Sequence, residues 1–251
     1  MTRITLVTGA SRGLGRNTAL AVARADGDVV LTYRSNAEEA QAVVAEIETL
    51  GRRAAALQLD TGKVDAFPAF VEHLREALHA TWQRDTFDHL VNNAGHGDTA
   101  PIAETSVAQF DRLVDVHFKG VFFLTQALLP LINDGGRIVN ISTGLTRFAY
   151  PGYAAYAATK AAVETLSVYM AKEFGARGIA VNTVAPGAIE TDFGGGAVRD
   201  NAQINAQLAG ITALGRVGVP DDIGPMIAAL LGDANRWVNA QRIEVSGGQA
   251  I

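Results

Sequence analysis

The sequence predicts an α/β domain, in which strands and helices alternate along the chain. Short apolar runs recur between longer segments of helical periodicity, and the first run leads into a glycine-rich turn. The chain has 251 residues, of which 48% are hydrophobic and 26 are Gly, which suits a large core joined by tight turns. No low-complexity tract, charge run or Pro/Ser-rich linker marks a boundary, so we expect one domain over residues 1–251.

The first half of the chain supplies four predicted strands, each a short and mainly apolar run, at 4–7, 29–33, 53–59 and 87–91. A helical pattern continues to about Ala25 after the first strand, and further helices are predicted at 37–50 and 64–83. His73 and His79 lie on the last of these helices. Their six-residue spacing does not suit a shared metal ion, and we predict no metal site.

The second half begins with a long helical stretch at 106–132, which Gly120 and Pro130 interrupt. The segment Phe193-Gly194-Gly195-Gly196 is expected to be either a substrate lid or a passive loop. The other predicted elements are strands at 137–141, 179–185 and 242–245, and helices at 153–174 and 220–231.

Composition and charge exclude several classes of protein. A formal net charge of −5, with acids and bases interspersed, argues against a nucleic-acid partner. Without cysteine, a disulfide, a thiolate nucleophile and an iron–sulfur site are excluded. Residues 1–3 lead directly into a strand, which is not the pattern of a signal peptide, and no apolar run approaches the ~18 residues that span a bilayer. We therefore expect a cytoplasmic protein with no membrane association.

The turn after the first strand has the context of a dinucleotide-binding turn, because it lies between a strand and a helix. Its glycines follow the spacing Gly-x-x-x-Gly-x-Gly and would let the backbone approach a pyrophosphate at the helix N-terminus. The alternative is a purely structural turn. The residues expected to bind the cofactor here are Gly9, Ser11, Arg12, Gly13, Leu14 and Gly15.

The end of the second strand predicts which dinucleotide binds. Tyr33 is followed by Arg34 and Ser35, and no carboxylate occurs before Glu38. An acidic residue here would accept from the ribose hydroxyls of NAD, whereas Arg can bind the 2′-phosphate of NADP. Arg12 offers a second cation for the same phosphate, so the pair favours NADP(H) over NAD(H).

Polar residues also follow the third and fourth strands. Asp60, next to Thr61, is expected either to accept from the adenine amino group or to cap the next helix. Asn92 and Asn93 precede a small-residue turn, where their amides can brace the central strands and let a cofactor approach the backbone.

The helix predicted at 153–174 carries Tyr156 and Lys160, four residues apart and therefore on one face. A phenol beside an ammonium group is a plausible proton donor, because the positive charge lowers a phenol pKa of about 10. Ser142 closes the strand predicted at 137–141 and would present its hydroxyl beside the phenol.

These motifs occur in the order typical of the short-chain dehydrogenase/reductase family, which the sequence resembles over essentially its whole length. The matching motifs are Thr-Gly-x-x-x-Gly-x-Gly at 8–15, Asn-Asn-Ala-Gly at 92–95, Ser142, Tyr-x-x-x-Lys at 156–160 and Pro-Gly at 186–187. The resemblance implies a single Rossmann-type, doubly wound domain with a seven-stranded parallel sheet and helices on both faces. It also implies NAD(P)(H)-dependent hydride transfer and a homotetramer or homodimer.

By this resemblance, Tyr156 is the general acid/base, Lys160 lowers its pKa and holds the nicotinamide ribose, and Ser142 binds the substrate oxygen. The resemblance also implies contacts of Thr191 and the Ile189 backbone with the nicotinamide carboxamide. The other residues expected at the cofactor are Tyr156, Lys160, Asp60, Thr61, Asn93, Ala94, Gly95, Pro186 and Gly187.

His117 departs from the family pattern, which has Asn at this position to support a water in a proton relay. Histidine can also hold a water, and its charge can change between pH 5 and 8. We hypothesise that His117 serves in the relay and adds a pH dependence; the alternative is a substitution of little effect.

The expected function is an NADPH-dependent carbonyl reductase acting on a small-molecule substrate. The alternatives are an alcohol or sugar dehydrogenase that works oxidatively, and a weakly catalytic NADP-binding regulator.

The sequence resembles the 3-oxoacyl-carrier-protein reductase branch, but residues 131–134 lack the basic side chains that an acidic carrier needs, which favours a free small ketone. Four rings are expected either to line an apolar pocket or to pack in the core, namely Phe148, Tyr150, Tyr153 and Phe193.

Overall fold

The computed structural model describes residues 2–251, so Met1, where the predicted domain begins, lies outside the described residues. Seven parallel strands form one sheet in the order β3-β2-β1-β4-β5-β6-β7, which confirms the predicted doubly wound, Rossmann-type architecture. The strands are β1 (Ile4–Val7), β2 (Asp28–Tyr33), β3 (Ala54–Gln58), β4 (Phe87–Asn92), β5 (Ile132–Ile141), β6 (Ala180–Pro186) and β7 (Arg242–Val245). The order reverses direction between β1 and β4, where open α/β sheets place their ligands.

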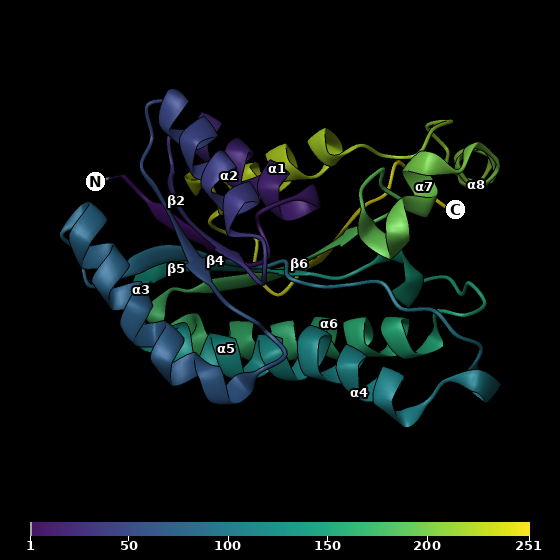
Figure 1. Ribbon diagram of the computed structural model, residues 1–251, viewed down its shortest axis with the longest axis horizontal. Helices are drawn as coiled ribbons and strands as arrows, with labels where there is room; N and C mark the ends of the chain where they lie inside the picture. The colour runs from purple at the N-terminus through teal and green to yellow at the C-terminus, as the bar shows by residue number, and fades with distance from the viewer. Residues whose placement is uncertain (1) are drawn as a thin grey trace.

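Helices cover both faces of the sheet in two layers (Figure 1). One layer contains α1 (Gly13–Arg24), α2 (Ala37–Thr49) and α9 (Gly224–Leu231). The other contains α3 (Phe67–Trp82), α4 (Val107–Val114), α5 (Gly120–Leu128) and α6 (Ala154–Phe174). Each layer closes its own hydrophobic core against the sheet. None of the helices formed by residues 2–251 combines the length and apolarity that crossing a bilayer requires.

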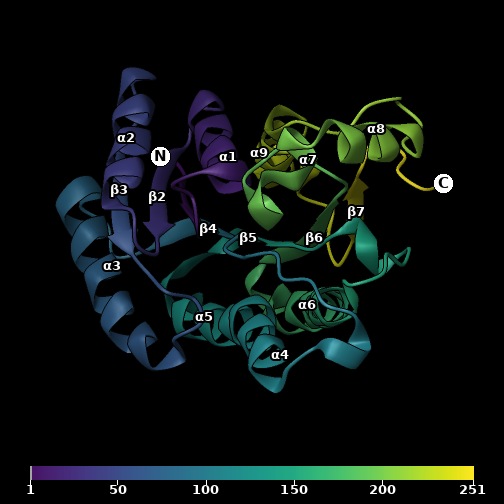
Figure 2. The ribbon, with the colours of Figure 1, turned by 45° about the vertical axis from the view of Figure 1, so that its right-hand side comes forward.

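Two further short helices, α7 (Ala197–Asp200) and α8 (Ala202–Gly210), lie beyond the carboxyl end of β6 (Figure 2). Neither helix was predicted from the sequence. For α8 a signal was present, because the Asn201 side chain caps the helix by accepting from the backbone N–H groups of Gln203 and Ile204.

The prediction of one long helix at 106–132 is wrong in detail, because this segment does not form a single helix. It is two α-helices joined by a π-helical segment, Asp115–Lys119, and β5 already begins at Ile132. Gly120 does not break the helix. A Cβ there would lie 2.2 Å from the backbone oxygen of Thr61, so glycine allows α5 to pack closely against the loop after β3.

Buried polar side chains connect the central strands to the helices below them. Asn92 on β4 donates to Asn140 on β5 (2.8 Å) and to Thr125 on α5 (3.1 Å). Asn140 in turn donates to Ser167 on α6 (2.8 Å), which also accepts from Thr183 on β6 (2.9 Å). Because buried polar groups are costly unless hydrogen-bonded, this network fixes the position of α6 against β5.

Candidate functional site

One pocket of about 810 Å³ opens at the carboxyl ends of the parallel strands. Every residue that the sequence analysis assigned to catalysis or cofactor binding lines this pocket, from Gly9 on the first turn to Thr191 after β6. The structure therefore brings together motifs that lie up to 182 residues apart in the chain, between positions 9 and 191.

The glycine-rich turn forms one end of the pocket, where α1 begins. Arg12 is the N-cap of α1, but no side chain caps the helix and its first turn carries no acidic residue. The first N–H groups of a twelve-residue helix therefore lack side-chain partners at the pocket, as binding of a phosphate requires. Gly9 has φ +63°, and a Cβ there would lie 2.9 Å from Cα of Ala94, so the turn tolerates only glycine at this position.

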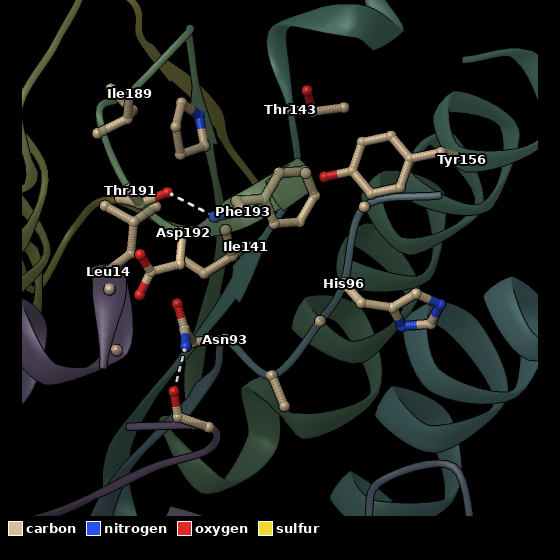
Figure 3. A pocket seen from close by; sticks show the side chains of 18 of the residues that line it. Leu14, Asn93, His96, Ile141, Thr143, Tyr156, Ile189, Thr191, Asp192 and Phe193 are labelled. Atoms are coloured by element: carbon tan, nitrogen blue, oxygen red, sulfur yellow. Dashed lines mark hydrogen bonds between the residues drawn. The ribbon is translucent and has the colours of Figure 1, made fainter. Parts of the chain in front are cut away.

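The Asn-Asn-Ala-Gly segment braces this turn, as predicted from the sequence. The Asn93 side chain donates to the backbone oxygens of Thr8 (2.9 Å) and Gly9 (3.2 Å). Figure 3 marks one hydrogen bond of this side chain with a dashed line. Asp60 also lines the pocket, and its carboxylate accepts from the N–H of Gly62 (3.0 Å). It therefore caps a local turn and not the next helix, which has Lys63 as its N-cap and no side-chain cap, so the expected contact with the adenine stays a prediction.

Arg12 and Arg34 line the same end of the pocket and are exposed. Neither guanidinium has an ion-pair partner among residues 2–251, whereas most other arginines of the chain are paired with carboxylates. Two unpaired guanidinium groups beside the end of β2 suit an additional phosphate, as in NADP.

Tyr156 lies on the opposite side of the pocket and is only 6% exposed. Burial raises the pKa of its phenol above the ordinary value of 10; the interaction with the Thr143 side chain opposes this effect, and Tyr153 adds to it. The rings of His117 and Phe193 are its neighbours, with centroids at 5.2 and 5.7 Å. The phenol is therefore protonated at neutral pH in this structure.

Lys160 is buried one turn further along α6, and burial lowers its pKa to about 8. Its Nζ donates to the backbone oxygen of Ile141 (2.8 Å) and lies 5.9 Å from the centroid of the Tyr156 ring. Burial of the phenol dominates the pKa of Tyr156 in this structure, and the expected lowering of that pKa by Lys160 stays a prediction.

The structure places Thr143, rather than Ser142, beside the Tyr156 hydroxyl (Figure 3). Ser142 also borders the pocket, but its hydroxyl donates to Glu164 on α6 at 2.6 Å. Thr143 has extended backbone, in which neighbouring side chains point in opposite directions, so only one of the two hydroxyls can face the phenol. The structure thus favours Thr143 over Ser142 as the hydroxyl that could bind the substrate oxygen. The sequence offered two adjacent hydroxyls and no means of choosing between them.

His117 lies in the π-helical segment and is completely buried. Its Nε2 is 2.8 Å from the backbone oxygen of His96, and its Nδ1 has no hydrogen-bond partner among residues 2–251. Burial, aided by the charge of Lys160, holds the pKa of His117 well below 6.5. The lowered pKa favours the neutral ring, and the expected pH dependence stays a hypothesis.

Several pocket residues were not predicted from the sequence. His96 follows the Asn-Asn-Ala-Gly segment and packs its ring 5.1 Å from that of His117. Asp192 follows Thr191, and α8 adds apolar side chains such as Leu208. These residues come from loops and a short helix, whose positions depend on tertiary packing rather than on local pattern.

Comparison with known proteins gives matches over nearly the whole chain. Residues 9–250 match a family model described as enoyl-(acyl carrier protein) reductase. An NADPH-dependent aldehyde reductase-like chloroplastic protein of Arabidopsis thaliana is 36% identical over 261 residues, covering 98% of this chain and 93% of the relative.

Two solved structures resemble the chain closely. The promiscuous reductase LugOII, which catalyses keto-reduction at C1 during lugdunomycin biosynthesis, has a TM-score of 0.93 and 38% identity, covering 99% of this chain and 98% of its own. The angucycline C-6 ketoreductase LanV with bound NADP has a TM-score of 0.94 and 34% identity, covering 99% of this chain and 95% of its own.

The burial of His117 predicts how stability depends on pH. The pKa of His117 is lower in the folded chain than in the unfolded chain. Below pH 6.5 the unfolded chain therefore binds a proton at His117 that the folded chain does not bind. The free energy of unfolding falls as the pH falls through 6.5. Between pH 7 and pH 5.5 the parent should lose about 1 kcal/mol more unfolding free energy than His117→Asn, measured by urea unfolding. The same substitution at exposed His73 is the control and should leave the pH dependence unchanged. If the unfolding free energies of the parent and of His117→Asn depend equally on pH, the pKa of His117 is not lowered in the folded chain.

Proposed function

The chain belongs to the short-chain dehydrogenase/reductase family, and within it we propose that the protein is an NADPH-dependent reductase of ketones. The observation that carries this proposal is a buried, protonated Tyr156 that shares one pocket with Thr143, Lys160 and a glycine-rich turn at a helix N-terminus. The relative named as an NADPH-dependent aldehyde reductase-like protein and the NADP-bound ketoreductase support the cofactor and the reaction class.

The residues present fit NADPH. The N-terminus of α1 would hold the pyrophosphate, and Arg12 and Arg34 would bind the 2′-phosphate. Pro186, which ends β6, and the residues Gly187, Ile189 and Thr191 that follow line the same pocket and would hold the nicotinamide. When bound, the cofactor supplies a hydride with its electron pair to the carbonyl carbon and is itself oxidised to NADP⁺.

Tyr156 would donate the proton in this reaction. Because burial raises its pKa, the phenol carries a proton at neutral pH, and this is the form that reduction of a ketone needs. The C=O π bond breaks as the carbon gains a hydride and the oxygen gains the Tyr156 proton, so the product is an alcohol. The oxidative direction would instead need a phenolate, which this environment disfavours.

Thr143 would donate a second hydrogen bond to the substrate oxygen, because its side chain is the hydroxyl group beside the phenol. A donor directed at the oxygen stabilises the negative charge that develops as the carbon–oxygen bond changes. Ser142 would act indirectly, since its bond to Glu164 anchors the segment that carries Thr143.

Lys160 would stabilise the phenolate that remains on Tyr156 after the proton has left. With a pKa of about 8 it is mainly cationic at neutral pH, and it lies one helical turn from the phenol.

A relay role for His117 stays a hypothesis, now with a neutral ring whose free Nδ1 could accept from a water. The expected homotetramer and the cytoplasmic location also stay predictions. Exposed rings on α4 to α6, such as Phe110 and Tyr169, support association of several copies of the chain.

Oxidation of NADPH and NADH against a panel of ketones, aldehydes and β-ketoesters tests the proposed function. We expect turnover with NADPH, weaker turnover with NADH because Arg12 and Arg34 have no phosphate to bind, and a loss of about 10²- to 10⁴-fold in kcat for Tyr156→Phe. Binding of NADPH without turnover of any carbonyl compound would contradict the proposal.

The choice between the two hydroxyls is tested by matched substitutions. Thr143→Val removes the hydroxyl but keeps the branched shape, and kcat should fall about 10²- to 10³-fold. Thr143→Ser should restore most of the activity, whereas Ser142→Ala should keep kcat within about fivefold of the parent and act mainly on stability. A large loss of kcat in Ser142→Ala, together with an active Thr143→Val, would return the role to Ser142.

A further inference from the structure

We propose that the substrate is an uncharged ketone that carries a flat aromatic ring, and that Phe193 is the residue that selects it. This inference rests on the proposed function, because it names the substrate class of the same site. It depends on the rings, the glycines and the charges that surround Tyr156.

Aromatic side chains dominate the pocket wall on the Tyr156 side. Phe148, Tyr150 and Tyr153 come from the segment after β5, and Phe193 comes from the segment after β6. Tyr150 and Phe193 remain 44% and 42% exposed, so these rings are open to the pocket and not packed into a core. From the sequence these rings were expected either to line the pocket or to pack in the core, and for Tyr150 and Phe193 the structure favours lining the pocket.

Phe193 and Tyr153 are the rings nearest the proposed proton donor. Their centroids lie 5.7 and 6.5 Å from that of Tyr156, inclined at 54° and 70°. Figure 3 shows the Phe193 ring beside the Tyr156 hydroxyl. A ketone whose oxygen reaches the phenol therefore places its neighbouring atoms within contact distance of these rings.

The backbone around Phe193 leaves room for its ring beside the phenol. Three glycines follow it, Gly194 to Gly196, with φ of +61°, +74° and +77°, a conformation that side chains rarely adopt. On the opposite wall, a Cβ on Gly97 would lie 3.0 Å from Cε1 of Phe193. Glycine at position 97 thus leaves the space into which the Phe193 ring fits.

The same side of the pocket offers no charge for an ionic substrate group. Among the described residues that line it after β5 and β6, only Lys160 and Asp192 are charged. Lys160 is bonded to the Ile141 oxygen, and Asp192 accepts from Arg199 at 2.5 Å. Charged residues that also line the pocket, such as Arg34 and Glu39, lie at the cofactor end. A carboxylate or phosphate on the substrate would therefore be buried without a partner, which is costly.

An aromatic ring in the substrate would instead gain edge-to-face or offset contacts with Phe193 and Tyr153. Each such contact strengthens binding by about 2- to 12-fold beyond the burial of area. A saturated ring of the same size buries similar area but lacks these contacts. The pocket should therefore distinguish the two rings by about tenfold.

A matched pair of ketones tests the inference. 2-Tetralone and 2-decalone share one bicyclic skeleton, and the aromatic ring of 2-tetralone is not conjugated with the carbonyl group, so their intrinsic reactivity is similar. We expect kcat/KM with NADPH to favour 2-tetralone by about tenfold. Phe193→Leu should reduce this preference to about twofold, whereas Phe193→Tyr, which keeps the ring, should retain it.

The outcomes separate the inference from the function on which it rests. If both ketones are reduced with equal efficiency, the aromatic substrate class is wrong and the ketoreductase function stands. If the preference survives in Phe193→Leu, Phe193 is not the selecting residue. If neither ketone is reduced although NADPH binds, the proposed function fails for ketones of this size, and the inference fails with it.

Discussion

The site depends on one chain of buried hydrogen bonds that runs across the middle of the sheet. Asn92 on β4 donates to Asn140 on β5, and Asn140 donates to Ser167 on α6. Because each of these groups is buried, a shift of α6 by one residue would leave several of them without partners, at about 1–3 kcal/mol each. The network therefore fixes Tyr156, which α6 carries, relative to the segment after β5 that carries Thr143.

Burial then determines the chemistry of the groups that this network positions. It raises the pKa of Tyr156, lowers the pKa of Lys160 to about 8 and keeps His117 neutral. All three effects act in the same direction, since each favours the uncharged form of the side chain. The result is a protonated phenol in an aromatic, largely uncharged pocket, which suits donation of a proton to a neutral carbonyl compound.

The sequence was sufficient for the architecture, because strand runs, glycine turns and helix periodicity are local signals. It was also sufficient to bring the motif residues to one pocket, since the carboxyl ends of parallel strands meet at one edge of the sheet, but it did not identify His96, Asp192 or Leu208 as pocket residues. It could not choose between Ser142 and Thr143, because that choice depends on which hydroxyl Glu164 engages across 22 residues of chain. Nor could it assign the pKa of His117, which follows from complete burial in a π-helical segment that no local pattern announced.

The most direct test of the account is a crystal structure of the protein with NADP⁺ and an unreactive ketone analogue. The account predicts that the analogue's oxygen lies within hydrogen-bond distance, about 2.5–3.0 Å, of both the Tyr156 hydroxyl and the Thr143 hydroxyl, with Ser142 still bonded to Glu164. An oxygen bound by Ser142, or bound away from Tyr156, would contradict it.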